Sequence, residues 1–579
     1  MTCINIVGSR RSQQNSQIES IPVSTNIAQH QRERILAAKK AGPSATFVEY
    51  LKLSGPGWLQ SAITLGGGSL AGSLYLGIIG GYELMWLQPL MMIFGIVMLS
   101  AIAHVTLCTG EKPFSALNFY ISPVLGWAWI VATVLANLVW AMPQFSLGAA
   151  ALRQNLGALT FTGGEFVAAA LLFVISTAIV WLYDQGGKCF QAFDIILKLM
   201  VGLVVASFFM VVVTMSASDA GLPWQQILAG FVPNPGLLFE PTQSLRPLVE
   251  QSSAPEYWHA TVVSAQRDRM VAAAATAVGI NMTFLLPYSM LKRGWDSEFC
   301  GLAKVDLGIG LFLPFLFATS CVVIAAGSQF HGRPEAGLIH IHQADGSAAL
   351  PAELVIAYEH NLNEMLEATE SETSPADMPE ADRILAATLI KRDAFALANS
   401  LERFTGRGIA QTVFGVGVIG MAVSSIVILM LINGFAFCEM SGLPATGWLY
   451  RVGCLLPGIT GSLGALSLWS GKANFYLAVP TSRFGMVLLP IAYIGFLCLM
   501  NNRRLLGAAM PAGVTRLVWN VLMGVGVTLA IIGAAISILN DATKVPGTSI
   551  LVRHIAVGFF AVLVLVGVVV SFTRRIRLN

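Results

Sequence analysis

Long apolar stretches recur along this chain, and their length is the feature that most constrains its fold. Twelve stretches reach the roughly 20 residues that a helix needs to cross a bilayer. They lie at about 55–80, 84–107, 123–150, 163–183, 189–215, 266–291, 302–328, 408–435, 446–468, 475–500, 513–539 and 552–573. Charged residues make up only 11% of the chain, against about a quarter in soluble domains. The sequence therefore predicts an all-α integral membrane protein with 12 transmembrane helices.

The basic residues are distributed unevenly between the two sides that these spans define. With the N-terminus in the cytoplasm, the inner segments hold Arg32, Arg34, Lys39, Lys40, Lys292, Arg293, Arg503, Arg504, Arg574, Arg575 and Arg577, and the short outer loops hold Lys472, Lys544 and Arg553. Because positive charge is retained on the cytoplasmic side, both termini are expected in the cytoplasm. Residues 1–40 lack the apolar core of a signal peptide, and a cell (inner or plasma) membrane location is predicted.

The polar segments divide the chain into parts. Residues 1–50 are predicted to be a cytoplasmic tail, 51–500 a core of ten helices, and 501–579 helices 11 and 12 with a basic C-terminus. The core includes an outer loop at 216–265 and an outer polar insertion at 329–407, which carries His340, His342, His360 and an acidic run. Such a loop could collect metal cations, but its charge and Ser/Pro content favour a solvated insertion without a core.

The first span is interrupted at its middle by Gly66, Gly67, Gly68 and Ser69. Each glycine costs a helix about 1 kcal/mol relative to alanine. Broken backbone at membrane depth is tolerated only where it is buried in protein or lines a cavity. A glycine-rich helix-packing surface is the alternative, although such surfaces usually space their glycines. We interpret the run as an unwound substrate site.

The sixth span carries a second group of helix-breaking residues. Gly279 and Asn281 precede Pro287, and an interior proline removes a backbone hydrogen bond and kinks the helix. The first span of each set of five is thus interrupted. Paired interruptions in corresponding halves indicate an inverted-repeat transporter whose site lies near the middle of the membrane.

Three segments resemble the Nramp family of divalent-metal transporters, which have the LeuT-type fold. They are GPGWLQSAITLGGGSLAG in the first span, AQTVFGVGVIGMAVSSIVILMLINGF in the eighth and PIAYIGFLCLMNNRRLLG in the tenth. The resemblance extends from about Ser54 to Gly507. It implies a 5+5 inverted repeat, broken helices 1 and 6, and secondary transport by alternating access.

The family's metal-binding motifs are absent at the matching positions. The first-helix motif Asp-Pro-Gly-Asn reads Gly66-Gly67-Gly68-Ser69. The sixth-helix motif Met-Pro-His falls on Thr283-Phe284-Leu285 if the upstream glycine is aligned, or on Leu286-Pro287-Tyr288 if the proline is aligned. Neither register supplies a methionine sulfur or an imidazole. The proton-linked aspartate of the third helix corresponds to Asn137, and a tenth-helix glutamine to Ser482.

These replacements change the ion chemistry that the site can support. Sulfur and imidazole ligands favour later first-row metals, and a buried ion without a compensating charge is very costly. We therefore expect transport of a small inorganic ion or polar solute other than Mn²⁺ or Fe²⁺, at a site without carboxylates. The expected substrate-binding residues are Thr64, Gly66, Gly67, Gly68, Ser69, Asn137, Asn281, Thr283, Tyr288 and Ser482.

Three further residues have candidate roles. Ser424 and Ser425 lie mid-span in the eighth helix, where hydroxyls of LeuT-type carriers can form a sodium site with first-helix carbonyls; bonding to their own helix is the alternative. Arg483, in the tenth span, is a candidate contact for an anionic substrate; the alternative is a side chain that reaches the outer interface or binds loop carbonyls. His104 in the second span is interpreted as a packing histidine.

Two other functions stay open. A carrier of largely hydrated, Mg²⁺-like divalent ions would need no soft ligands, because Mg²⁺ gives up water reluctantly. A non-transporting receptor could use the outer insertion. No nucleophile with a base can be assembled, so an enzyme is not expected, and no cofactor, metal site or nucleic-acid partner is predicted. The expected partners are an ion or small-molecule substrate and the lipid bilayer, and the sequence does not give the oligomeric state.

Overall fold

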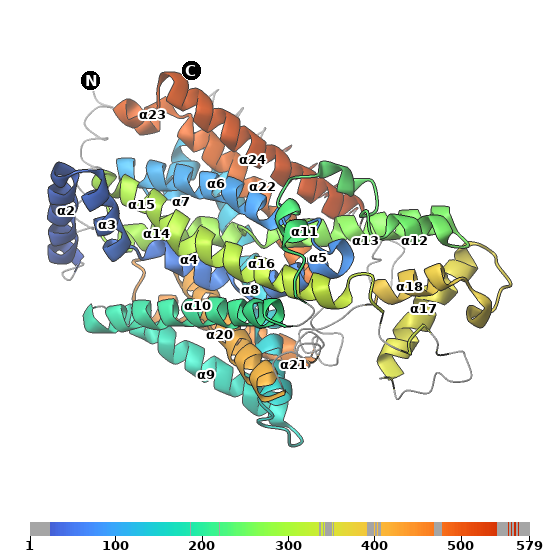
Figure 1. The fold of residues 1–579 in the computed structure, drawn as a ribbon. Helices are drawn as coiled ribbons and strands as arrows, with labels where there is room; N and C mark the ends of the chain where they lie inside the picture. Colours follow the sequence, from blue (N-terminus) through green and yellow to red (C-terminus); the bar gives the residue numbers. More distant parts are fainter. Residues whose placement is uncertain are drawn as a thin grey trace.

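A computed structural model describes residues 24–540, with gaps at 186, 219–220, 335–336, 340, 342–349, 351, 391–398, 400–401, 403–406 and 468–477, and a few positions between 554 and 566. All regular structure within these residues is helical. The long helices lie along one direction in Figure 1, with α2, α3 and α15 at one end and α17 and α18 at the other. We name these the basic end and the insertion end.

The first eleven predicted spans all coincide with helices. In order, these are α4 (Pro56–Thr64) with α5 (Gly67–Gly80), α6 (Leu87–Thr109), α8 (Pro123–Ala150), α9 (Gly164–Gln185), α10 (Gly187–Ser216), α13 (Pro255–Ala275) with α14 (Ile280–Lys292), α15 (Cys300–Asp306) with η5 (Leu307–Phe312) and α16 (Leu313–Phe330), α20 (Arg407–Met440), α21 (Gly447–Ser467), α22 (Ala478–Met500) and α24 (Gly513–Leu539).

Among the described residues, nine helices are long and apolar enough to cross a membrane, and the bent pair α4 and α5 would make a tenth. Helix α21 takes the place of the ninth predicted span but is not among these. The twelfth predicted span, 552–573, falls almost wholly outside the described residues.

Shorter elements connect the spans or extend from them. They are α2 (Ser24–Ala41), α3 (Pro43–Leu53), α7 (Pro113–Ala116), η1 (Leu117–Ile121), η2 (Ala151–Asn155), α11 (Trp224–Ala229), η3 (Pro235–Leu238), α12 (Arg246–Gln251), η4 (Ser297–Phe299), α17 (Ala352–Ala368), η6 (Pro375–Asp377), α18 (Glu380–Thr388), α23 (Arg503–Leu506) and η8 (Gly507–Ala509).

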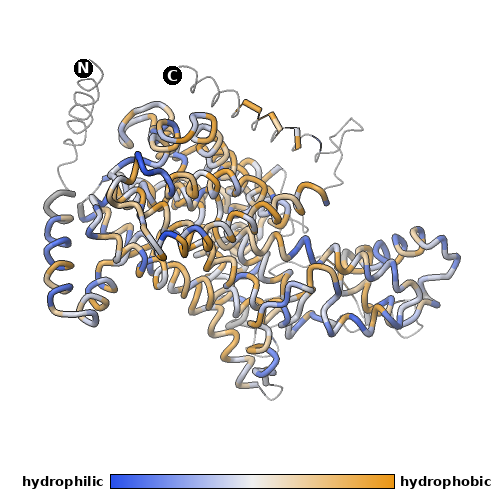
Figure 2. Tube along the Cα trace, turned by 90° about the horizontal axis from the view of Figure 1, so that it is seen from above, coloured by the Kyte–Doolittle hydropathy of each residue, from blue (hydrophilic) through white to orange (hydrophobic). Residues whose placement is uncertain are grey.

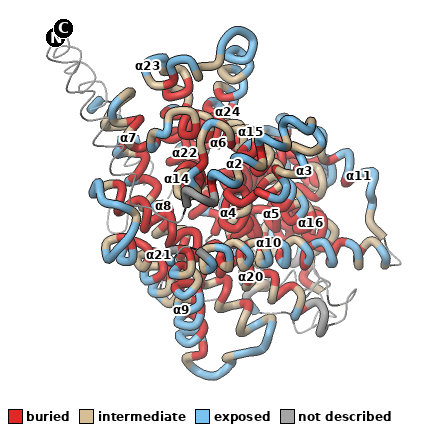
Figure 3. The backbone as a smooth tube through the Cα atoms, turned by 90° about the vertical axis from the view of Figure 1, so that its left-hand side faces the viewer, coloured by how far each residue is buried: buried red, intermediate tan, exposed pale blue. Residues whose placement is uncertain are grey.

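Burial separates the central helices from the peripheral ones. In the most apolar stretch of the span formed by α13 and α14, 94% of the residues are buried, and in that of α20, 89% are buried. In the corresponding stretches of α9, α10 and α24 only 39% are buried. These three helices are nevertheless strongly apolar. Figure 2 shows hydrophobic residues along most of the long helices, and Figure 3 shows the buried residues gathered toward the centre. Helices that are apolar on their exposed faces are adapted to lipid, so α13, α14 and α20 form the protein interior.

The polar insertion at 329–407 is folded where the structure describes it, which corrects the expectation of a solvated segment. Its helices α17 and α18 bury Tyr358, Leu362 and Leu385 completely. The Asp382 carboxylate of α18 accepts hydrogen bonds from the Ser253 backbone N–H at 2.9 Å and from Trp258 Nε1 at 2.6 Å. A buried carboxylate with these donors joins the insertion to the loop at 216–265. His340 and His342 lie outside the described residues.

Charged side chains hold the start of the first broken span at the basic end. The Asp306 carboxylate accepts hydrogen bonds from the backbone N–H groups of Gly55 at 3.1 Å and Gly57 at 2.6 Å. The Lys198 ammonium donates to the Ser54 carbonyl at 2.8 Å. Because the first N–H groups of a helix have no partner within it, Asp306 fixes the N-terminus of α4 from a distant span.

Candidate transport site

The glycine run breaks the first span as predicted. Helix α4 ends at Thr64 and α5 begins at Gly67, and the two axes differ by 56°. Between them Leu65 has φ −81° and ψ 60°, and Gly66 is extended. A side chain at Gly66 would be excluded, because a Cβ there would lie 2.4 Å from Ser425 Oγ. The first glycine is thus needed for close packing against α20.

Side chains from other helices satisfy the backbone groups that the break releases. Gln144 Oε1 on α8 accepts the Gly67 N–H at 2.8 Å. Ser424 Oγ donates to the Ala62 carbonyl at 3.0 Å, and Ser425 Oγ donates to the same carbonyl at 3.2 Å. Ser69 Oγ donates to the Thr64 carbonyl across the break. Since no water is available at membrane depth, α8 and α20 stabilise the unwound segment.

The second break lies earlier in the sixth span than its proline. Helix α13 ends at Ala275 and α14 begins at Ile280, with Gly279 in an extended conformation before it. Pro287 lies inside the continuous helix α14, so the interruption lies at Gly279, the first of the predicted helix-breaking residues, and not at the proline. Among the described residues only the α4–α5 pair bends by more than 40° at its break, and the sixth span is interrupted without a comparable bend.

A cavity of about 20 Å³ lies between the two breaks. This volume holds on the order of one water molecule. It is lined by Ile63, Thr64, Gly66, Gly68, Ser69, Trp140, Pro143, Gln144, Thr276, Met282, Thr481 and Ser482. None of these lining residues is acidic, basic or a histidine. The cavity therefore offers hydroxyls, one amide, backbone groups and one thioether, all of them neutral.

The thioether corrects the expectation that the site has no methionine sulfur. Met282 is almost fully buried, and its Sδ accepts a hydrogen bond from Thr64 Oγ1 at 3.1 Å. The Gly279 N–H also points at this sulfur, at 3.4 Å. Neither alignment of the sixth-helix motif placed its methionine at residue 282. Alignment on the upstream glycine assigns that methionine to Thr283, one residue later. A soft donor is present after all.

Of the predicted substrate-binding residues, five line the cavity. They are Thr64, Gly66, Gly68, Ser69 and Ser482. Gly67 lies directly beside it and bonds Gln144.

The other four lie in the surrounding packing. Asn137 Nδ2 on α8 donates to Asn433 Oδ1 on α20 at 2.8 Å. Thr283 Oγ1 accepts from Trp129 Nε1 at 3.0 Å, Tyr288 stacks on Phe284 with ring centroids 4.2 Å apart, and Asn281 Oδ1 accepts the Met282 N–H. These contacts place the four residues in the packing around the cavity and not in its lining.

The candidate anion contact points away from this cavity. Arg483 Nη1 lies 3.4 Å from Asp268 Oδ2 on α13, and its Nη2 donates to the Ser537 carbonyl on α24 at 3.0 Å. Its charge is compensated within the protein. The Arg483 guanidinium therefore links α22 to α13 and α24 beside the site.

Several buried side-chain amide atoms of the broken spans and of α8 and α20 lack a hydrogen-bond partner. They include both polar atoms of the Gln60 side chain, Asn281 Nδ2, Asn137 Oδ1 and Asn433 Nδ2. Gln60 lies one turn before Thr64 on α4, and its carbonyl accepts the Thr64 hydroxyl. Unsatisfied buried polar atoms are rare in native proteins, so these amides can form further hydrogen bonds.

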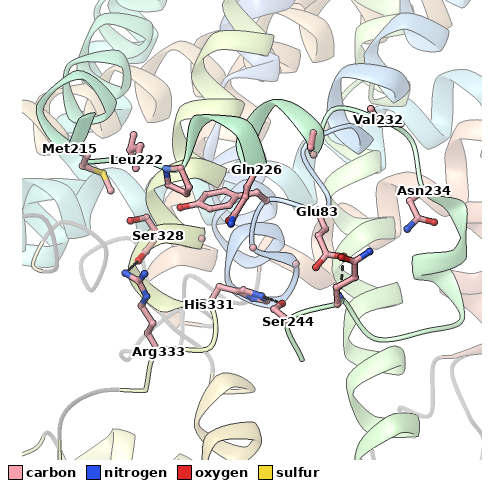
Figure 4. Close-up of a pocket in the computed structure, with 18 of the residues that line it drawn as sticks. Glu83, Met215, Leu222, Gln226, Val232, Asn234, Ser244, Ser328, His331 and Arg333 are labelled. Atoms are coloured by element: carbon pink, nitrogen blue, oxygen red, sulfur yellow. Dashed lines mark hydrogen bonds between the residues drawn. The ribbon is translucent and has the colours of Figure 1, made fainter. Parts of the chain in front are cut away.

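A larger cavity of about 1560 Å³ lies at the far ends of α5, α10 and α16. Its acidic, histidine and basic lining residues are Glu83, His331 and Arg333, which Figure 4 shows around the opening. Burial raises the pKa of Glu83, although backbone N–H groups of Gln243 and Ser244 oppose this. Burial also lowers the pKa of His331, whose Nδ1 bonds the Ile78 carbonyl. The cavity is a recess with mixed polar and apolar lining at the insertion end.

Sequence patterns missed Gln144 and Met282, the two most informative lining residues. Gln144 follows Asn137 by seven residues, two helical turns, and so shares its face of α8. The sequence signal for Gln144 was a glutamine in the middle of a span, on the same helix face as the Asn137 amide. Met282 could not be placed from sequence, because the break shifts the register by an amount that only the backbone path determines.

Two interrupted helices that enclose a small polar cavity at their breaks are typical of polytopic membrane transporters. The profile of the Nramp family, described as natural resistance-associated macrophage protein-like, matches residues 57–350 and 383–541. This range covers most of the chain, which therefore belongs to the Nramp family. Metal transporter Nramp2 of Populus trichocarpa is 30% identical over 156 residues, 25% of this chain and 27% of the relative. The match thus spans about a quarter of that relative.

Solved structures agree with the fold. A histidine-to-alanine mutant of the Eremococcus coleocola manganese transporter superposes with a TM-score of 0.60 and 15% identity, covering 91% of this chain and 94% of the other. The same transporter with an aromatic bis-isothiourea compound gives a TM-score of 0.61 at 15% identity, over 92% and 94% of the two chains. The predicted LeuT-type fold is confirmed.

Proposed function

We propose that this protein is a secondary transporter that works by alternating access and moves a small inorganic ion or polar solute other than Mn²⁺ or Fe²⁺ across the cell membrane. In this proposal residues 51–500 form the transporter core and both termini face the cytoplasm. The observation that carries it is the neutral lining of the cavity between the two breaks.

Charge, rather than ligand softness, distinguishes this site from one for Mn²⁺. The Met282 sulfur provides a soft donor, so a lack of soft ligands is no argument against a transition metal. A dehydrated divalent ion, however, needs compensating negative charge, and burying it among neutral dipoles alone is very costly. Thr64, Gln144 and Ser482 supply dipoles only. A monovalent ion or neutral solute fits this lining better.

The unpartnered amides support a polar route beside the site. Gln60 and Asn281 lie on the two broken spans, and the Asn137–Asn433 pair joins α8 to α20. In an open conformation, water or a passing substrate could satisfy these groups. These hydrogen bonds would offset part of the free energy, about 1–3 kcal/mol, that each unpartnered buried group costs.

A hydrated divalent ion resembling Mg²⁺ is the second candidate substrate. This candidate is favoured because the similar proteins are a metal transporter and a manganese transporter by name. Mg²⁺ keeps several of its waters, and waters can bond hydroxyls and amides without protein carboxylates. A cavity of about 20 Å³ is too small for such an ion, so the site would have to widen when it opens.

Sodium coupling is a further part of the proposal. Both Ser424 and Ser425 reach a first-span carbonyl, and Ser424 Oγ is also 3.1 Å from the Met421 carbonyl. Hydroxyl and carbonyl oxygens from two helices converge there, which is the kind of ligand set that Na⁺ accepts. The same hydroxyls cap the released carbonyls, and sodium-dependent uptake distinguishes the two roles.

The test is ion uptake by the full-length protein in liposomes, with internal dyes for metal and pH. Mn²⁺, Mg²⁺, Na⁺, K⁺ and small anions are supplied in turn. Saturable movement of a monovalent ion, an anion or a polar solute without Mn²⁺ entry supports the proposal. Mg²⁺ entry alone supports the second candidate, and proton-coupled Mn²⁺ entry contradicts both. Folded protein that moves no solute supports a non-transporting receptor.

A further inference from the structure

One histidine and two cysteines meet at the basic end, away from the candidate transport site. His104 and Cys108 lie one turn apart on α6, and Cys300 begins α15. One potential ligand atom from each lies within 4.8 Å of the other two, and all three side chains are half-buried. The sequence predicts no metal site here, because the third residue lies almost 200 positions beyond the other two.

Two of the three ligand-to-ligand distances match the edges of a tetrahedral metal site, and the third, between Cys300 and His104, is at most 4.8 Å. Zinc binds sulfur at about 2.3 Å and imidazole nitrogen at about 2.0–2.1 Å. At tetrahedral angles these bond lengths place two sulfurs about 3.8 Å apart and a sulfur and a nitrogen about 3.5 Å apart. The Cys108 and Cys300 sulfurs are 3.8 Å apart, and Cys108 Sγ is 3.5 Å from His104 Nδ1.

The imidazole is also oriented as a metal ligand. His104 Nε2 lies 3.0 Å from the Ala509 carbonyl oxygen. A carbonyl can only accept, so Nε2 carries a proton, and when the ring is neutral its Nδ1 lone pair faces the Cys108 thiol. Metal-binding histidines usually donate their other N–H to a carbonyl or carboxylate, which fixes the tautomer. Ala509 in η8 provides this contact from a third part of the chain.

Charge distinguishes this cluster from the transport cavity. Two thiolates and one neutral imidazole would balance a divalent ion, whereas the lining of the cavity between the breaks is neutral throughout. Thiolate and imidazole ligands select Zn²⁺ and other soft or borderline metals over Mg²⁺ or Mn²⁺. Three protein ligands leave a fourth position for water or another donor.

We propose that His104, Cys108 and Cys300 form a binding site for a soft or borderline transition-metal ion such as Zn²⁺, separate from the transport site. The bound ion would join α6 to α15, which belong to the second and seventh spans. In the two halves of an inverted repeat these spans are equivalent. The site lies at the end where α15 and α23 are found (Figures 1 and 3). It does not depend on the proposed function, because binding is measured without transport.

The experiment is a Co²⁺ titration of the full-length protein in detergent, kept reduced with a non-thiol reductant and followed by absorption spectroscopy. We expect one Co²⁺ per chain, thiolate-to-cobalt charge-transfer bands, the intense visible bands of tetrahedral cobalt, and displacement by Zn²⁺. Loss of an outer-shell partner costs about 10–100-fold in metal affinity. Cys108→Ser and Cys300→Ser each remove a direct ligand and are expected to weaken binding by more than about a hundredfold.

Cys498→Ser is the matched control, because Cys498 is equally half-buried but lies on α22 outside the cluster. Its Co²⁺ spectrum is expected to equal that of the unmodified protein. His104→Ala is expected to keep a charge-transfer band at altered energy, since the thiolates remain. Size-exclusion elution checks the folding of each variant. The proposal is overturned if the unmodified protein gives no thiolate–cobalt band, or if the band persists in the Cys108→Ser/Cys300→Ser double variant.

Discussion

The Met282 sulfur and the Thr64 hydroxyl are 3.1 Å apart, so the two interrupted spans meet through a direct contact between their side chains. Thr64 is the last residue of α4, and Met282 lies in the first turn of α14. A movement of either half-helix must break this contact or carry the other half-helix with it. The pair therefore couples the geometry of the two breaks.

The size of the cavity predicts that a large side chain at Gly68 abolishes transport. A Cβ at Gly68 already lies 3.3 Å from Ser482 Oγ, so the branches of leucine in Gly68→Leu would fill the space. Gly202→Leu is the matched control, because a Cβ at Gly202 meets no atom within 4 Å. Liposome uptake should be lost only in the first variant, with equal membrane insertion of both. Full uptake by Gly68→Leu would place the site elsewhere.

The Asn137–Asn433 amide pair predicts a non-additive pair of substitutions. Each residue is completely buried, and one hydrogen bond of 2.8 Å joins them. Asn137→Leu or Asn433→Leu leaves the other amide without a partner and should cost about 1–3 kcal/mol of stability. The double variant removes both amides and should cost less than the sum of the two. A double-mutant cycle on thermal unfolding measures the coupling, and strict additivity would show that the bond contributes nothing.

The Asp306 carboxylate predicts a graded effect on the start of α4. Asp306→Ala leaves the N–H groups of Gly55 and Gly57 without an acceptor and should destabilise the protein by about 1–3 kcal/mol. Asp306→Asn keeps one acceptor oxygen and should cost less. Melting temperatures in detergent compare the two variants. An equal loss in both would mean that the negative charge matters more than the hydrogen bonds.

His331 predicts a contribution to stability that depends on pH. Burial lowers its pKa below the ordinary value of about 6.5. The folded protein therefore favours the neutral ring, and its contribution to stability is present above pH about 6.5 and lost as pH falls through the lower pKa of the folded state. Melting temperature should drop less between pH 7 and pH 5 in His331→Asn than in the unmodified protein. Equal drops would contradict this assignment. Comparing the two proteins removes the opposite contribution of Glu83, whose pKa is raised.

Sequence patterns predicted the helical spans and the first break well, because apolar length and consecutive glycines act locally. They placed Thr64, Gly66, Gly68, Ser69 and Ser482 at the cavity. They placed the second break in the correct span, where the interruption lies at Gly279 and Pro287 is accommodated inside α14. They did not indicate Met282, Gln144 or the His104 cluster, whose contacts depend on distances between helices. Cys300 and Ala509 approach His104 from other parts of the chain.

The most direct test of a neutral transport site compares Mn²⁺ uptake by the unmodified protein and by Gln144→Glu. The substitution keeps an acceptor for the Gly67 N–H and adds one carboxylate to the cavity lining. Measured in liposomes with metal and pH dyes, the unmodified protein should admit no Mn²⁺ above background. Gln144→Glu should gain Mn²⁺ binding or uptake, because the added charge offsets the cost of burying the ion. Saturable, proton-coupled Mn²⁺ uptake by the unmodified protein would contradict the account.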